Sequence, residues 1–160
     1  MREAVLYDFH GTLVDVTSVH GYLAQRKYEE FYLASLACPR IETTVLAARQ
    51  SHEAGYQNIL FTGMPNEYRD GLLAWLGRHG VPIDLIDMRP TGDFRKDFIV
   101  KREMYLRTLD QGIRVVRAWD DNPVILDLWE EQAIPVVRVP GWNGNLMKRR
   151  VDKAAPTVLG

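Results

Sequence analysis

The stretch at residues 4–13, AVLYDFHGTL, constrains the fold more than any other part of the chain. Its short apolar run is typical of a strand buried on both faces of a parallel sheet. The run ends at Asp8, and open α/β sheets carry their chemistry at the carboxyl ends of strands. Gly11 then allows a sharp turn, and Thr12 places a hydroxyl beside the carboxylate. Asp8 is therefore a candidate nucleophile or metal ligand.

Size and composition restrict the class of protein. A chain of 160 residues fits one domain with a sizeable core. Its formal net charge of −1 gives no global attraction to nucleic acid or membrane, so any affinity for nucleic acid has to come from a local patch. The single cysteine excludes an internal disulfide and fits a reducing compartment. With no signal peptide and no membrane-length apolar run, we expect a cytoplasmic protein without a membrane partner.

Apolar strands alternate with helical patterns along the chain. After the first strand and a polar loop at 14–21, we expect helices at 22–36, 41–54, 67–79, 96–109 and 124–132, and strands at 58–61, 85–88, 115–119 and 136–139. This alternation predicts parallel βαβ units with right-handed crossovers, and hence an α/β fold with a three-layer, Rossmann-like, doubly wound parallel sheet. We expect one domain over residues 1–142 and a basic C-terminal tail over 143–160.

Polar residues follow three of the predicted strands. Asp8, Thr62 and the pair Asp120 and Asp121 each come at or just after a strand end. If the Asp8 strand is central and the strand at 115–119 flanks it, three carboxylates converge at one edge of the sheet. Converging carboxylates repel one another unless a cation neutralises them. Oxygen ligands without a cysteine or histidine cluster favour Mg²⁺ over zinc.

Four segments resemble the motifs of the haloacid dehalogenase (HAD) superfamily of phosphotransferases. Residues 8–13, DFHGTL, resemble the first motif, which has the pattern Asp-x-Asp-Gly-Thr. Residues 61–63, FTG, resemble the second motif, and Lys96 stands where the third motif has a lysine. Asp120 and Asp121 resemble the acidic fourth motif. Each match is weak alone, but four in the right order are a specific signal.

A closer similarity is to the 3′-phosphatase domain of phage-type polynucleotide kinase/phosphatases. It rests on residues 92–97 (GDFRKD) followed by 100–103 (VKRE), on 55–57 (GYQ), and on 119–121 (WDD) running into 124–129. The resemblance covers roughly residues 4–142. Since no GxxxxGK[ST] phosphate loop occurs, a kinase half is absent from this sequence.

The resemblance implies a phosphatase that works through an aspartyl-phosphate. Asp8 would attack phosphorus, and charge neutralisation would matter more than base catalysis. The implied roles are catalysis by Asp8, His10 and Lys96, phosphate binding by Gly11, Thr12, Thr62, Gly63 and Lys96, and Mg²⁺ binding by Asp8, the backbone carbonyl of His10, Asp120 and Asp121. Taken singly, Thr62 is better explained as a helix cap, Lys96 as a solvated charge, and the Asp120–Asp121 pair as a turn.

His10 departs from the family pattern, in which the second Asp of the first motif protonates the leaving oxygen and then activates water. An imidazole near its usual pKa does both near neutral pH, so we expect activity to be retained. The alternative is a non-catalytic module that binds phosphate ends, or a domain that stalls at the acyl-phosphate.

The substrate is less well specified by the sequence. The short spacing between motifs leaves no room for a large cap domain, and an open site suits a polynucleotide end. We expect a nucleic-acid 3′-phosphate as substrate, with a small nucleotide as the alternative, and a separate kinase or ligase as a candidate partner. DNA versus RNA and the oligomeric state stay open. Candidate nucleic-acid contacts are Arg95, Lys101, Arg102 and the tail cluster at 148–150, for which a solvated charge run is the simpler interpretation.

Overall fold

The chain folds around a five-stranded parallel sheet. The computed structural model describes residues 2–142. The strands are β1 (Arg2–Tyr7), β2 (Gln57–Pro65), β3 (Leu85–Arg89), β4 (Ile113–Asp120) and β5 (Val136–Arg138). They lie in the order β3-β2-β1-β4-β5, and every pair is parallel. The predicted α/β class is confirmed, with β1 in the centre and β4 beside it.

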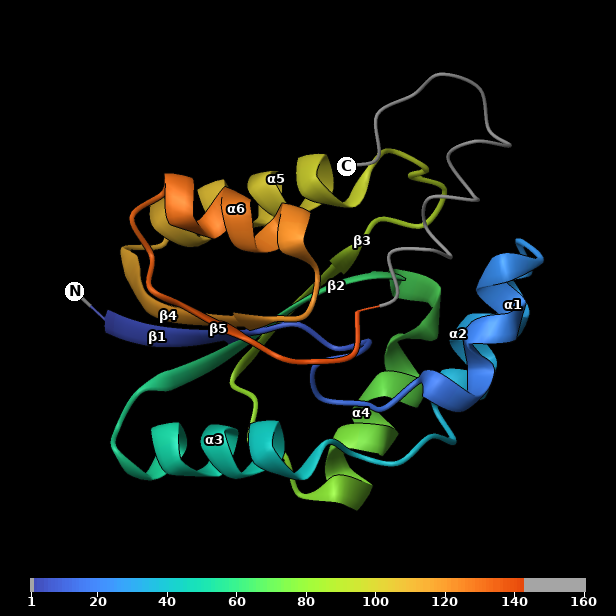
Figure 1. The fold of residues 1–160 in the computed structure, drawn as a ribbon. Coiled ribbons are helices and arrows are strands. Elements are labelled where there is room, and N and C mark those ends of the chain that lie inside the picture. The colour runs from blue at the N-terminus through green and yellow to red at the C-terminus, as the bar shows by residue number, and fades with distance from the viewer. Residues whose placement is uncertain (1, 143–160) are drawn as a thin grey trace.

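Helices cover both faces of this sheet (Figure 1). On one face lie α3 (Glu42–Glu53) and α4 (Arg69–His79), and on the other lie α5 (Asp97–Asp110) and α6 (Pro123–Glu131). Each face has its own hydrophobic core, with Trp75 buried on the first and Trp129 on the second. The two cores and the sheet between them make the predicted three-layer arrangement.

Local sequence signals account for two of the helix ends beside the sheet. Asn122 begins α6: its side chain accepts a hydrogen bond from the amide of Val124, and Pro123 occupies the first turn. Gly80 ends α4 in the left-handed conformation, with φ 63°, which costs glycine little. Asn122 directly follows the acidic pair, so the cap of α6 also fixes where the Asp120–Asp121 turn stops.

The segment between β1 and α3 differs from the prediction of a loop followed by one helix at 22–36. It forms the short 3₁₀ helix η1 (Thr17–Val19) and two helices, α1 (His20–Ala24) and α2 (Tyr28–Ser35). The break lies at Arg26, whose φ is 58°, a left-handed backbone that interrupts a helix. These two short helices lie beyond the strand ends, and no large cap is inserted there (Figure 1).

Strand β2 is longer than predicted. The strand predicted at 58–61 stops before Thr62 and Gly63, but β2 continues to Pro65, which pairs with Arg89 of β3 after an irregularity in the register. The 3₁₀ helix η2 (Asn66–Tyr68) then leads into α4. Thr62 is consequently a strand residue and does not cap a helix.

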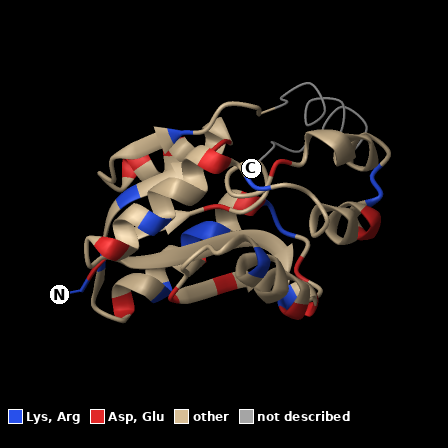
Figure 2. Ribbon diagram, turned by 90° about the horizontal axis from the view of Figure 1, so that it is seen from below, with Lys and Arg blue, Asp and Glu red and all other residues tan. Residues whose placement is uncertain are grey.

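Charge is spread over the molecule in small groups. Figure 2 shows lysine and arginine interspersed with aspartate and glutamate over the helices and the sheet. Within residues 2–142, no helix has the length and apolar character that crossing a bilayer requires. The predicted basic tail lies outside the described residues.

Candidate active site

Three carboxylates meet at the carboxyl edge of the sheet. Asp8 follows β1, Asp120 ends β4, and Asp121 comes next. The strands are adjacent, with Tyr7 opposite Trp119, and the Asp8 amide donates to the Trp119 carbonyl at 3.1 Å. Oxygens of all three side chains lie within 4.8 Å of one another, and all three residues are buried. The predicted convergence of these carboxylates is therefore present.

The cation beside these carboxylates is Lys101. Its Nζ donates to Asp8 Oδ1 at 2.8 Å and to Asp120 Oδ2 at 3.2 Å, and the residue is only 3% exposed. Burial lowers the pKa of Lys101, but the charges of Asp120, Asp8 and Asp97 outweigh it, so the pKa is raised and the ammonium stays protonated.

The lysine that bonds to these carboxylates is Lys101 and not the predicted Lys96. Lys96 is the N-cap residue of α5, five positions before Lys101, and among the described residues it makes no ion pair with these carboxylates. The sequence did carry a signal for Lys101, because it lies between Val100 and Met104 on the buried face of α5. A lysine on the core side of a helix needs a buried partner, here Asp8 and Asp120.

Thr12 and the turn around it support Asp8. The Thr12 hydroxyl donates to Asp8 Oδ2 at 3.0 Å and also lies 3.5 Å from Asp121 Oδ1. The amide of Gly11 donates to the Val14 carbonyl, and that of Thr12 to the Phe9 carbonyl. These amides, expected to bind phosphate, are thus already used within the turn, and Thr12 orients the carboxylate.

Both predicted phosphate-binding glycines sit against acidic side chains. Gly11 has φ 79°, and a Cβ there would overlap the Asp121 carboxylate. A Cβ at Gly63 would clash with the carboxylate of Asp97, a site residue that the sequence reasoning missed. Close approach of a carboxylate therefore explains why each position is glycine. The buried hydroxyl of Thr62, predicted to contact phosphate, accepts a hydrogen bond from the Met64 amide.

The His10 side chain packs against α2. Its Nε2 is 3.0 Å from Ser35 Oγ, and that hydroxyl donates to the Tyr32 carbonyl at 2.7 Å. A hydroxyl has one proton, so Ser35 accepts from His10, and His10 carries its proton on Nε2. Nδ1 is then the nitrogen with a free lone pair. Ser35 is a second residue missed from the sequence, since it lies 25 positions away.

Burial changes the acid–base behaviour expected of His10. It lowers the pKa to about 4, against the opposing effect of the Asp8 and Asp97 charges. The expectation of a pKa near the usual value is wrong for the free protein, in which the neutral imidazole dominates at pH 7. A bound phosphate dianion would shift this pKa upward again, because opposite charge favours the protonated ring.

The acidic pair also has shifted pKa values. Burial and the Asp8 charge raise the pKa of Asp120 to about 7, while Lys101 and the Asn122 amide oppose the rise. Burial, Asp8 and Asp120 raise the pKa of Asp121 well above its usual range. One ammonium therefore does not compensate three buried carboxylates. The all-oxygen donor set fits a hard divalent cation, which would be held by Asp8, Asp120 and Asp121.

The loop before α5 is tied together by two arginines. Arg89, at the end of β3, donates to the carbonyls of Gly63, Asp93 and Arg95 and to the Asp97 carboxylate. Arg95 is bound to both Asp93 and Glu103. Neither predicted substrate contact is a free surface cation, because Arg95 is ion-paired and Lys101 is buried.

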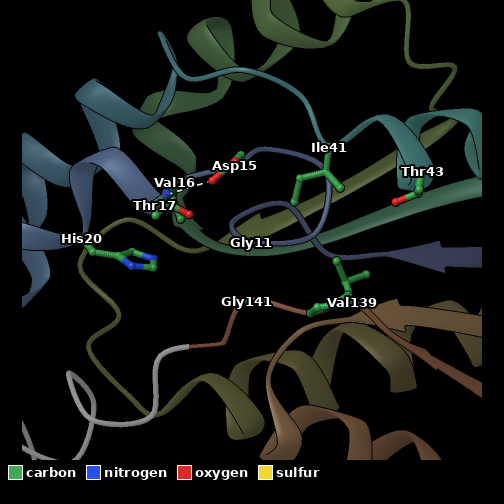
Figure 3. A pocket seen from close by; sticks show the side chains of 10 residues that line it. Gly11, Asp15, Val16, Thr17, His20, Ile41, Thr43, Val139 and Gly141 are labelled. Carbon is green, nitrogen blue, oxygen red and sulfur yellow. Dashed lines mark hydrogen bonds between the residues drawn. The ribbon is translucent and has the colours of Figure 1, made fainter.

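A cavity of about 290 Å³ opens beside the motif-one turn (Figure 3). Apolar walls come from Val16, Ile41 and Val139, and His20 and Asp15 lie at its margin. Gly11 is the only predicted site residue in its lining, so this cavity borders the site and does not contain the carboxylates.

Comparisons with known families give one match over nearly the whole described chain. Residues 2–143 match the family described as the polynucleotide kinase PNKP phosphatase domain, in the HAD group. The comparison with curated proteins gave no match.

Solved structures share the fold. Two structures of a Pnkp1/Rnl/Hen1 complex, the second called an RNA repair complex, contain chains with 26% and 28% identity and TM-scores of 0.74 and 0.75. Each match covers 87% of this chain but only 45% and 42% of the other, so this sequence spans less than half of those proteins. A class C acid phosphatase from Bacillus anthracis has 12% identity and a TM-score of 0.61, over 98% of this chain and 81% of the phosphatase, and shows the fold alone.

Proposed function

Because this chain belongs to the family of polynucleotide kinase PNKP phosphatase domains and is a phosphatase of the HAD type, we propose that it removes 3′-phosphates from polynucleotide ends through an aspartyl-phosphate on Asp8. The observation that carries the proposal is the hydrogen-bonded cluster of Asp8, Lys101, Asp120 and Thr12. It holds a carboxylate in a fixed position beside cationic charge, as attack on a phosphate dianion requires.

Asp8 is held for in-line attack by two donors. Lys101 takes Oδ1 and Thr12 takes Oδ2, so the carboxylate cannot rotate freely. Fixing a nucleophile before the reaction removes part of the entropy cost of reaching the transition state. When Asp8 attacks, a bond forms between its oxygen and phosphorus, and the bond from phosphorus to the 3′-oxygen breaks.

We propose that Mg²⁺ is the cation held by Asp8, Asp120 and Asp121. When bound, it supplies the positive charge that offsets repulsion between the carboxylates and the incoming phosphate. The Lys101 ammonium supplies a further fixed charge at the same oxygens. Because Asp120 and Asp121 have raised pKa values in the free protein, binding a cation there releases protons.

His10 is proposed to move the protons through Nδ1. In the substrate complex the phosphate charge favours the imidazolium, which donates a proton to the departing 3′-oxygen. The neutral ring that remains accepts a proton from water as water attacks the aspartyl-phosphate, and free phosphate and the Asp8 carboxylate are restored. The hydrogen bond from Nε2 to Ser35 leaves Nδ1 as the exchanging atom in both steps.

The nucleic-acid substrate is supported by the family and by the solved relatives, whose complex is named for RNA repair. A polynucleotide end also suits a site without a large cap. We infer from this that a kinase or ligase activity acts at the same ends.

One experiment tests the substrate class. Purified protein with Mg²⁺ is given an aryl phosphate, a 3′-phosphorylated oligonucleotide in DNA and RNA forms, and a 3′-mononucleotide, and phosphate release is measured. We expect the oligonucleotide to have the highest kcat/KM and Asp8→Asn to abolish release from all of them. Release from the mononucleotide but not the oligonucleotide would refute end processing and favour a nucleotidase. Phosphate-dependent binding of the oligonucleotide without release from any compound would overturn the catalytic assignment.

A further inference from the structure

Two tyrosines continue the row of aromatic rings that begins at His10. The Tyr32 ring stacks on the His10 ring with 5.8 Å between centroids and 28° between planes. Tyr68 lies 5.2 Å from Tyr32. Tyr32 comes from α2, after motif one, and Tyr68 from η2, after motif two. Two segments 36 residues apart in the chain are thus joined by one aromatic pair, and the α2 ribbon lies beyond the end of the sheet, near the start of α4 (Figure 1).

Neither tyrosine is a full core residue. Phe31, next to Tyr32, is 4% exposed and belongs to the hydrophobic core, whereas Tyr32 and Tyr68 are only half-buried. They therefore present ring surface at the rim of the site. Exposed aromatic faces beside a phosphate-handling site are the form that sequence-tolerant base stacking takes.

The charges around the pair limit what can lie on it. Burial and the nearby carboxylates of Glu67, Glu29 and Glu30 all raise the pKa of the Tyr68 phenol. Three carboxylates repel a phosphodiester backbone but not an uncharged base. The strand therefore has to leave the site in another direction, and α5, with the exposed Arg102, is a cationic alternative.

Resting on the proposed function, we propose that Tyr32 and Tyr68 form the subsite for the terminal nucleobase, the base of the nucleotide whose 3′-phosphate is removed. The phosphate lies at Asp8, the 3′-oxygen at His10, and the base stacks on the tyrosines, two ring contacts out from the histidine. The subsite recognises an aromatic plane and gives little discrimination among the four bases. A phosphorylated end that lacks its base is correspondingly a poor substrate.

The test compares a variant with a matching change in the substrate. Tyr68→Ala is the variant, because Tyr32 also packs on His10 and its loss would disturb catalysis. The substrates are 3′-phosphorylated oligonucleotides that end either in a normal nucleotide or in an abasic sugar. Tyr68→Phe keeps the ring, and Tyr56→Ala removes an exposed tyrosine that directly precedes β2, at the other end of that strand.

On the normal end, Tyr68→Ala is expected to lower kcat/KM by roughly 5- to 100-fold, mainly through KM, as one lost stacking contact implies. Tyr68→Phe and Tyr56→Ala are expected to stay within about twofold of the parent. The abasic end should lose a similar factor with the parent protein. Combining Tyr68→Ala with the abasic end should then cost less than the product of the two losses, because both remove the same contact.

Three results would overturn the subsite. If the kcat/KM losses from Tyr68→Ala and from the abasic end multiply in full, the terminal base binds elsewhere. If Tyr68→Ala lowered kcat equally on the normal and on the abasic oligonucleotide, Tyr68 would be a structural residue of the site. An unchanged kcat/KM for Tyr68→Ala on the normal end would remove the contact altogether. Failure of the proposed function is distinguishable from these outcomes, since the parent protein would then release no phosphate from either oligonucleotide.

Discussion

The two sides of the active site are built differently. On the carboxylate side, Asp8, Asp120 and Lys101 are buried and share direct hydrogen bonds across β1, β4 and α5. On the histidine side, His10 contacts α2, a helix of eight residues in the segment that departs from the predicted structure. The chemistry that neutralises charge is therefore fixed by the sheet, whereas the chemistry that moves protons depends on a small added segment.

This difference indicates how His10 can stand where the family has an aspartate. A residue on the sheet side has to satisfy several charged partners at once. Within residues 2–142, the His10 side chain has one hydrogen-bond partner, Ser35, and also contacts aromatic rings. A neutral imidazole suits these largely apolar surroundings, because its single N–H needs only one acceptor.

The largest effect that separates the two sides is expected from Lys101. Lys101→Met removes the ammonium from Asp8 and Asp120 and should lower kcat by roughly 10²- to 10³-fold, since one charge-stabilising donor is lost. Lys96→Met is the matched control on the same helix and should stay within about twofold. Steady-state kinetics on a 3′-phosphorylated oligonucleotide check both, with circular dichroism to confirm folding. A greater loss for Lys96→Met would reverse the assignment of the lysine.

The second effect tests the proton-transfer role of His10. His10→Ala should lower kcat by about 10²-fold, the scale of general acid–base catalysis, and should let aspartyl-phosphate accumulate because water is no longer activated. His10→Asp should keep or raise activity. Rapid quenching with radiolabelled substrate measures the trapped phosphoenzyme. Equal kcat values for His10→Ala and the parent would show that this ring moves no rate-limiting proton.

The third effect concerns the cation and pH. With Mg²⁺ at about 100 times its Kd, the free energy of unfolding should rise by about 2.7 kcal/mol at pH 8. At pH 6 the gain should be about 1.4 kcal/mol smaller, because Asp120, with a pKa of about 7, must first lose a proton. The sign without metal is opposite: a raised carboxyl pKa stabilises the fold at low pH, and that contribution is lost as pH rises through 7.

Thermal unfolding with EDTA or Mg²⁺ at the two pH values measures both trends. Asp120→Asn should reduce the pH dependence of the Mg²⁺ effect, to which Asp121 still contributes, whereas Asp127→Asn, an exposed residue of α6, should leave it unchanged. A larger Mg²⁺ effect at pH 6 than at pH 8 would contradict a site made of these carboxylates.

The smallest effect tests the support of His10. Ser35→Ala removes the acceptor for Nε2–H, and a lost hydrogen bond of about 1 kcal/mol corresponds to a roughly fivefold lower kcat. Ser18→Ala, an exposed serine of η1, is the control. The ¹⁵N chemical shifts of His10 report the tautomer directly. An unchanged Nε2–H tautomer in Ser35→Ala would show that another group sets it.

Much of the fold followed from local patterns. Apolar runs such as the one before Asp8 identified the strands, and Asn122, Pro123 and Gly80 marked helix ends correctly. The interrupted helix at 22–36 was missed because the break depends on a left-handed Arg26, for which the residue type gives no warning. The length of β2 was missed because pairing with β3 overrides the turn tendency of Gly63.

The sequence by itself determined which carboxylates come together, because parallel strands end at one edge and each of these aspartates lies at such an end. Only the tertiary structure decided that Lys101 and not Lys96 reaches Asp8, since that depends on which face of α5 packs on the sheet. It also decided the tautomer and the lowered pKa of His10, because both arise from α2, whose contacting residues are more than 20 positions away. Strand ends are local features of a chain, whereas the burial and the partners of a side chain belong to the folded molecule.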